Sequence, residues 1–250
     1  MKSFTFMTVI ILIAFSIAST SLGAAKEIPL PGSNDIEKYF MENINRFKKT
    51  DRFPKFGLNI RRIKPLNYDT IFSKHRIFQV DIDRMYLEIV YPGTFSSSGY
   101  FATDGKDILY LNRTNTDNTE TLFKNENIQI DELDATTFCS FLSLTILTNG
   151  AKSYRVISSV SEIIDFAQAN KGYEVNYVEI GKFGSDIHPP KISGDRESGW
   201  EIEFYTFGGW MHEVTTVARH LFKISSQYKI QYAEDILTTQ AFSKVPRIMY

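Results

Sequence analysis

Apolar and polar residues alternate most clearly in residues 200–224, where the pair Gly208 and Gly209 separates two such runs. Successive side chains of a β-strand point to opposite faces of the sheet. The even positions of both runs are mostly apolar, beginning with Trp200 and Phe204, whereas the odd positions include several charged residues. This pattern predicts an antiparallel hairpin with one buried face and one polar face.

The length of the hairpin loop decides whether the two apolar faces coincide. A two-residue turn at the glycine pair would place even positions opposite odd ones, and a one-residue slip moves every side chain to the other face. We therefore predict an odd-length loop in which glycine takes a positive φ. In that register Phe204 faces His212 on the buried side, and Glu203 faces Glu213 on the polar side.

Periodicity and turn residues predict the remaining elements. Helical spacing after capping residues indicates helices from Asn34 to the Lys48 region, at residues 135–148 and at residues 159–170. Strands are expected at residues 56–63, 71–82, 85–91, 100–102, 108–111, 122–130, 154–157, 173–180 and 228–232, with a loop at 181–199. The predicted fold class is α+β, with antiparallel β-meander sheets and two to three helices packed on one face.

A helix followed by a meander occurs in both halves of the chain. The simpler interpretation is a single α+β domain over residues 24–250, and the alternative is two lobes that meet near residues 125–134. A distant duplication would explain the repeated order, although the two halves share no residue-level repeat.

The first 23 residues have the pattern of a secretory signal. Lys2 precedes an apolar run over residues 6–18, and the small residues Ser21 and Gly23 mark a cleavage site. We therefore expect an exported protein, periplasmic or extracellular, without a membrane span after cleavage. Removing Lys2 from the 28 basic residues leaves 27 against 29 acidic ones. This balance argues against nucleic acid as a partner.

Cys139 is the single cysteine, so an intrachain disulfide is excluded even though export would permit one. Its place in an amphipathic helical segment predicts a buried, inert thiol. Asn112 begins a glycosylation sequon, which matters only in a eukaryotic source.

The two histidines of the hairpin stand at even positions and are expected to point toward the apolar face. Eight residues apart on a strand, they lie roughly 26 Å from each other at about 3.3 Å per residue, too far to share a zinc ion. They are either satisfied core histidines or contacts to a ligand in a pocket between sheet and helix. The candidate ligand-binding residues are His212, His220, Phe204, Trp200 and Trp210, and neither a metal nor a cofactor is expected.

Groups suited to catalysis are scattered along the sequence. Glu203 and Glu213 would suit glycoside hydrolysis as a carboxylate pair, but solvated surface carboxylates are the simpler interpretation. His188 follows Asp186 closely without a neighbouring nucleophile. The sequence contains neither a G-x-S-x-G nor a P-loop motif.

These observations favour an exported, non-catalytic binding protein of the envelope or extracellular space. An aromatic-lined sheet face would bind a small apolar ligand or a protein partner. The first alternative is an exported hydrolase whose site is assembled around His212 from distant residues. The second is an envelope structural protein that pairs sheet edges between copies.

Overall fold

The computed structural model describes residues 28–39, 56–86, 94–111, 116–148, 152–169, 173–210 and 213–244. The predicted signal segment, Asn112 and His212 lie outside these ranges. Residues 33–39 are helical, which agrees with the start of the first predicted helix; the rest of that helix lies outside the described residues.

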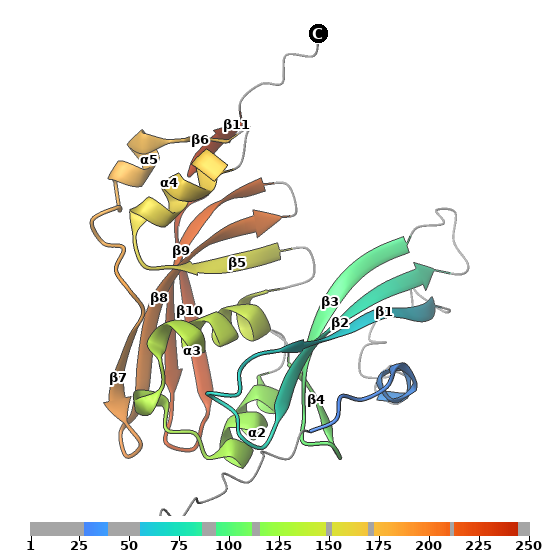
Figure 1. Cartoon of the computed structure of the whole chain (residues 1–250). Coiled ribbons are helices and arrows are strands. Elements are labelled where there is room, and N and C mark those ends of the chain that lie inside the picture. Colours follow the sequence, from blue (N-terminus) through green and yellow to red (C-terminus); the bar gives the residue numbers. More distant parts are fainter. Residues whose placement is uncertain are drawn as a thin grey trace, which may run out of the picture.

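Within the described residues, the strands form a four-stranded sheet, a five-stranded sheet and a two-stranded ribbon, all antiparallel (Figure 1). The first sheet is a meander of β1 (Phe56–Leu66), β2 (Arg76–Tyr86), β3 (Thr94–Thr103) and β4 (Ile108–Leu111). The second sheet has the order β10 (Ile230–Thr238), β9 (Glu213–Ile224), β8 (Gly199–Trp210) and β5 (Lys152–Ile157), and β7 (Lys191–Asp195) also pairs with β8. The ribbon joins β6 (Tyr173–Val175) to β11 (Phe242–Lys244).

Helical segments connect the two sheets and cover them. They are α2 (Asp117–Glu126), a 3₁₀ turn (Ile130–Glu132), α3 (Ala135–Leu142) with a π-helical extension (Ser143–Leu147), α4 (Val160–Ala169) and α5 (Tyr177–Gly181). The antiparallel sheets and packed helices confirm the predicted α+β class. Among the described helices, none has both the length and the apolar character needed to cross a membrane.

The largest hydrophobic cluster contains residues from both sheets, from α2 and from α3. Phe123 of α2 and Phe138 of α3 pack in the same cluster as Tyr100 of the first sheet and Phe222 of the second. Figure 1 shows α3 crossing the second sheet and α2 lying toward the first. Apolar burial of this kind is the main favourable term in folding, so the two sheets depend on one shared core.

A second hydrophobic cluster covers part of the opposite face of the second sheet. Tyr205 and Phe207 of β8 pack there against Ile163 of α4 and Phe242 of β11. These two aromatic residues occupy odd positions of the hairpin, on the side predicted to be mostly polar. The alternation therefore holds for the part of β8 near Trp200, whereas both faces are buried farther along the strand.

The hairpin register corrects the predicted loop. β8 continues through Gly208 and Gly209 to Trp210, which pairs with Glu213, so two residues lie between the paired positions rather than an odd number. A β-bulge between Gly208 and Gly209 supplies the one-residue shift that we had assigned to the loop. Even positions still face even positions from Trp200 to Gly208. The prediction that even positions of the two strands face each other is confirmed. The prediction that the loop supplies the one-residue shift was wrong, because the shift lies within the paired strands.

Residues 122–130, predicted as a strand, belong mainly to α2. Leu122, Phe123 and Glu126 are buried at helical spacing, and acidic residues in the first turn with Lys124 in the last turn suit the helix dipole. Asn127 then ends the helix in the left-handed conformation. The strand prediction was wrong, because a short apolar stretch fits both the helical and the strand periodicity.

Several further boundaries differ from the prediction: where two strands were expected over residues 71–82 and 85–91, one strand, β2, runs from Arg76 to Tyr86, and residues 87–91 lie outside the described residues. The strand expected over residues 173–180 ends at Val175, because the Asn176 side chain accepts a hydrogen bond from the Glu179 amide and caps α5. The loop expected over residues 181–199 contains β7, which pairs with the first half of β8. Sequence alternation in β7 is weak because its side chains are mostly exposed.

We predict that Phe222→Ala lowers the free energy of unfolding by about 3–5 kcal/mol, because it opens a cavity in the shared core. Phe222 is 1% exposed and stacks on Phe204 with ring centroids 5.7 Å apart. Leu221, the next residue of β9, is 37% exposed and provides the matched control. Urea unfolding should show a much smaller loss for Leu221→Ala, and equal losses would contradict the assigned faces.

Candidate functional site

Three of the candidate residues of the hairpin are core side chains. Trp200, Phe204 and His220 are at most 1% exposed and belong to the buried face of the second sheet. Phe204 pairs with His220, with ring centroids 5.2 Å apart, so the predicted pairing of Phe204 with His212 was wrong. Trp210 lies at the end of β8, and His212 lies outside the described residues. Ligand contact by these residues stays a prediction.

Both ring nitrogens of His220 lie next to hydroxyl groups of the protein. Nε2 is 2.7 Å from Thr206 Oγ1, and Nδ1 is 3.4 Å from the Tyr232 hydroxyl. A buried imidazole needs such partners, because an unpaired polar group inside a core is costly. His220 therefore has the surroundings of a satisfied core histidine.

Glu203 forms the centre of a polar cluster on the opposite face of the second sheet. It pairs with Leu221 across the strands, so the predicted opposition to Glu213 was wrong. Its Oε1 accepts a hydrogen bond from Arg219 Nε at 2.7 Å and lies 3.5 Å from His188 Nε2. Burial alone would raise the pKa of Glu203, but the hydrogen bond and charge of Arg219 outweigh burial and lower the pKa.

His188 therefore contacts Glu203, a residue of β8 that the sequence does not place beside it. The other ring nitrogen, Nδ1, lies 2.8 Å from the Pro189 carbonyl oxygen. A carbonyl and a carboxylate are both acceptors, so both ring nitrogens face groups that want a proton. A neutral imidazole carries one N–H and can donate to only one of these two acceptors, so the contacts orient the ring without occupying both nitrogens.

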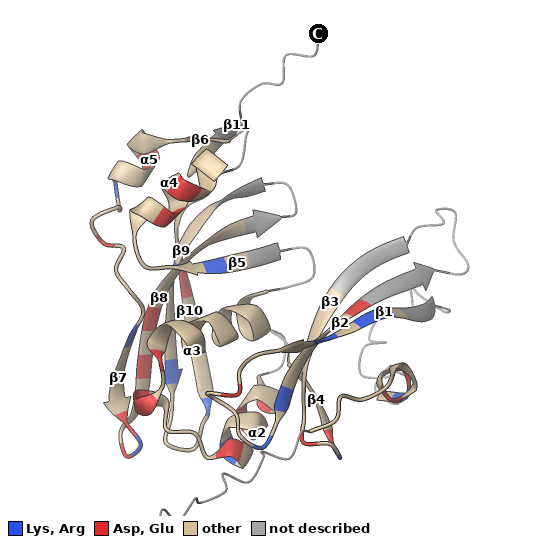
Figure 2. Cartoon of the chain, in the orientation of Figure 1, with Lys and Arg blue, Asp and Glu red and all other residues tan. Residues whose placement is uncertain are grey.

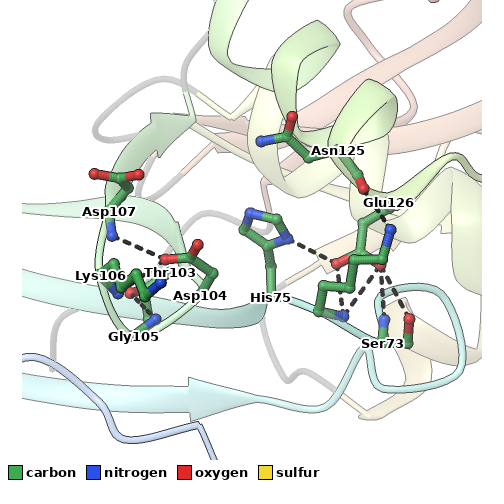
Figure 3. Close-up of polar contacts among 10 residues, drawn as sticks. Ser73, His75, Thr103, Asp104, Gly105, Lys106, Asp107, Asn125 and Glu126 are labelled. Atoms are coloured by element: carbon green, nitrogen blue, oxygen red, sulfur yellow. Dashed lines mark hydrogen bonds and ion pairs between the residues drawn. The ribbon is translucent and has the colours of Figure 1, made fainter.

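A buried acid–histidine pair joins the first sheet to α2 and was missed in the sequence. His75 Nδ1 lies 2.7 Å from Glu126 Oε1, and the Glu126 side chain is 1% exposed (Figure 3). The same carboxylate accepts hydrogen bonds from the backbone amides of Ser73 and Lys74. The partners lie 51 residues apart in the sequence, so no local spacing could reveal them.

The His75–Glu126 pair is electrostatically well supported. Burial raises the pKa of Glu126, but the hydrogen bonds from His75, Ser73 and Lys74 outweigh burial and lower the pKa. Figure 3 places the His75 ring between Glu126 and the turn that contains Asp104. Asp104 accepts backbone hydrogen bonds from Lys106 and Asp107, chiefly the latter, which lower its pKa. These contacts indicate that the pair of His75 and Glu126 has a structural role, because it attaches α2 to the backbone that precedes β2.

A surface depression at one end of the second sheet combines residues from α2 and from two strand turns. We call it the turn pocket; it has a cavity volume of about 650 Å³. Its lining residues are Asp117, Glu120, Thr121, Lys124, Asn127, Arg196, Ser226, Gln227, Tyr228 and Lys229. Among the described residues, Asn127 and Tyr228 are the non-glycine residues with positive φ, at 53° and 64°, and both line this pocket.

The walls of the turn pocket are held by contacts to the core. The Tyr228 ring stacks on Trp200 with centroids 5.8 Å apart, and its hydroxyl donates to the Ile128 carbonyl at 2.9 Å. Glu120 accepts hydrogen bonds from Lys229 Nζ at 2.6 Å and from the Ile230 amide at 3.0 Å. Trp200 thus contacts the pocket indirectly, because it stacks on Tyr228, a residue of the pocket wall.

The thiol of Cys139 is buried in the shared core, as predicted. Burial, with a smaller effect from Asp134, raises its pKa well above the ordinary value. A thiol that stays protonated is a poor nucleophile and a poor metal ligand. In the part of the chain that the structure describes, no group of three or more His, Cys, Asp or Glu residues is placed to hold a metal ion.

In comparisons with family models, curated proteins and solved structures, no match to the chain was found. The geometry of the described residues therefore carries the functional argument. It includes the buried His220 with a polar group next to each ring nitrogen, the buried pair of His75 and Glu126, and the turn pocket with its charged walls.

We predict that Glu126→Gln lowers the free energy of unfolding by about 1–3 kcal/mol at neutral pH, because an amide leaves buried partners unsatisfied. The pKa of Glu126 in the folded state lies below its ordinary value of 4.5. Its contribution is therefore complete above that pH and is lost as the pH falls through the folded-state pKa. Urea unfolding across a series of pH values measures both effects.

The matched control is Glu132→Gln, because Glu132 is exposed on the neighbouring 3₁₀ turn. This substitution should change the free energy of unfolding by less than about 0.5 kcal/mol. The difference between wild type and Glu126→Gln should shrink in acid, and a difference that stays constant would contradict the role of the ionised carboxylate.

Proposed function

We propose that this chain is an exported, non-catalytic binding protein of the envelope or the extracellular space. The signal pattern of residues 1–23 supports export. The burial of His75 and His220 supports a role without catalysis, because a general base must lie within reach of a substrate.

The observation that carries the proposal is the engagement of His188 and His220. Each has both ring nitrogens next to a polar group of the protein. The remaining described histidine, His75, is buried and held by Glu126. These contacts tie the three side chains to the fold, which argues against a hydrolase built on them alone; His212, on which the hydrolase alternative is centred, lies outside the described residues.

The geometry favours binding of a ligand or protein partner at the surface over binding at the aromatic face of the β8–β9 hairpin. Trp200, Phe204 and His220 are packed in the core, so a small apolar ligand on that face would have to displace core side chains. Displacing close-packed residues costs several kcal/mol (~2–5 for one large side chain). A ligand or protein partner at an open surface such as the turn pocket meets no such cost.

Export predicts a specific mature product. Expression of the full chain in a secreting host should give a protein outside the cytoplasm that begins at Ala24, because the signal segment is removed. N-terminal sequencing and mass spectrometry of the secreted fraction measure this directly. Leu12→Arg places a charge in the apolar run and should retain the chain inside. A wild-type chain that stays in the cytoplasm would contradict export.

The absence of catalysis predicts that His188→Gln leaves any background turnover unchanged. Purified wild type and variant should show equal rates on chromogenic ester, glycoside and phosphate substrates, since His188 is occupied by Glu203 and Pro189. A rate that falls with His188→Gln would favour the hydrolase alternative. Size-exclusion chromatography of the same samples separates the envelope structural alternative, which requires pairing between copies.

A further inference from the structure

We propose that the turn pocket binds an oxyanion, a phosphate or sulfate group carried by a small molecule, between Lys124 and Arg196. This inference rests on the proposed binding function and names the chemical class of its ligand. The argument uses the convergence of the basic residues, the placement of the acidic ones and the rigidity of the walls.

Three basic residues reach the pocket from separate elements. Lys124 lies in the last turn of α2, Arg196 in the turn between β7 and β8, and Lys229 in the turn between β9 and β10. Figure 2 shows basic residues beside acidic ones at α2 and at the β7–β8 turn, at the same end of the second sheet. The fold therefore gathers charges that are far apart in the sequence.

The acidic lining residues act on one side of the pocket. Glu120 pairs with Lys229 at 2.6 Å, and its side chain is 11% exposed. The hydrogen bond and charge of Glu120 raise the pKa of Lys229, with a smaller effect from Asp117. Glu120 is thus paired with Lys229, and Lys124 and Arg196 are the remaining basic residues of the lining. Counted together, three basic and two acidic residues give the lining a formal charge of +1.

Arg196 is held in position before any ligand arrives. One of its terminal nitrogens donates to Asn127 Oδ1. The turn that carries it is fixed by Asp195, whose Oδ1 accepts the amides of Glu197 and Ser198. A guanidinium has five N–H donors in a planar fork, so the donors not used by Asn127 can bind an oxyanion through two parallel hydrogen bonds. Fixing the side chain in advance reduces the entropy lost on binding.

An unusual backbone conformation lies at this pocket, at Tyr228. Asn127 and Tyr228 both adopt the left-handed region, which a bulky residue such as tyrosine rarely occupies. Buried contacts hold Tyr228 there: the Trp200 ring below it and the Ile128 carbonyl at 2.9 Å. Strained conformations that are maintained by their surroundings occur preferentially at ligand sites. Asn127 accepts the hydrogen bond from Arg196, and Tyr228 directly precedes Lys229, so both left-handed residues are next to basic residues of the lining.

The size of the pocket indicates what carries the oxyanion. Its cavity volume of about 650 Å³ falls in the range of small-molecule sites, roughly 300–1,000 Å³. A bare phosphate ion would leave most of this space to water. The exposed polar residues Ser226 and Gln227 at the rim suit a hydroxyl-rich body such as a sugar. We therefore expect a phosphate or sulfate ester to bind more tightly than the free ion.

Isothermal titration calorimetry on the full chain tests the proposal with defined probes: glucose 6-phosphate, glucose 6-sulfate, inorganic phosphate, inorganic sulfate and glucose. Lys124→Gln and Arg196→Gln should each weaken binding of the esters by about tenfold, since each removes a charge-assisted contact. Arg196→Lys should lose part of that affinity, because an ammonium cannot bind through a planar fork. Binding should weaken as salt is added.

The matched control is Lys191→Gln, an exposed basic residue of β7 that does not line the pocket. It should leave affinity unchanged, and urea unfolding should show that all variants remain folded. Equal binding of ester and free ion would support the oxyanion site and identify the ion itself as the ligand. Glucose binding as tightly as its esters, no binding of any anion, or equal losses in Lys191→Gln and Arg196→Gln would overturn the inference.

The outcome for the proposed function is separate. No binding of any anion, together with a protein or apolar ligand that binds wild type and Arg196→Gln with the same affinity, would overturn the oxyanion site while leaving the exported binding protein intact. A chain that binds the esters but stays in the cytoplasm would support the oxyanion site and contradict the exported binding protein.

Discussion

The position of α2 is the constraint on which the described structure depends. The helix lies between two sheets that share one hydrophobic cluster, and two of its carboxylates attach it on both sides. Glu126 accepts hydrogen bonds from His75 and from the backbone that precedes β2, whereas Glu120 binds Lys229 and the Ile230 amide at the start of β10. Buried charges are tolerated only with such partners, so these carboxylates specify how α2 meets each sheet.

The same arrangement separates the core from the surface that can recognise a ligand. The aromatic face of the β8–β9 hairpin is buried by packing, and His220 on that face has polar protein groups next to both ring nitrogens. The turn pocket, in contrast, is open to solvent and lies at the ends of strands, where turns carry charged side chains. Trp200 links the core to the turn pocket, because its ring is buried in the hydrophobic cluster and stacks on Tyr228, which lines the pocket. A core residue can therefore shape a binding surface without touching the ligand.

Local patterns predicted the strands and helices where one face is buried and the other exposed. β4 has the predicted bounds, Ile108–Leu111, and α4 lies within the predicted residues 159–170. Prediction failed where both sides are covered or where a segment is short. Tyr205 and Phe207 were overlooked because a second cluster buries the opposite face of β8, and α2 was misread because a short apolar stretch fits either period.

The sequence by itself determined the α+β class, the buried Cys139, the parity of the hairpin and the signal pattern at the N-terminus, because each follows from composition or from residues close together in the chain. Only the tertiary structure decided which histidine faces Phe204, which carboxylate holds His75 and which basic residues meet at the turn pocket. These contacts join segments separated by tens of residues, for example 51 between His75 and Glu126 and 69 between Asn127 and Arg196. Such pairings depend on strand register, on one bulge at Gly208 and on the packing of α2, which local periodicity does not encode.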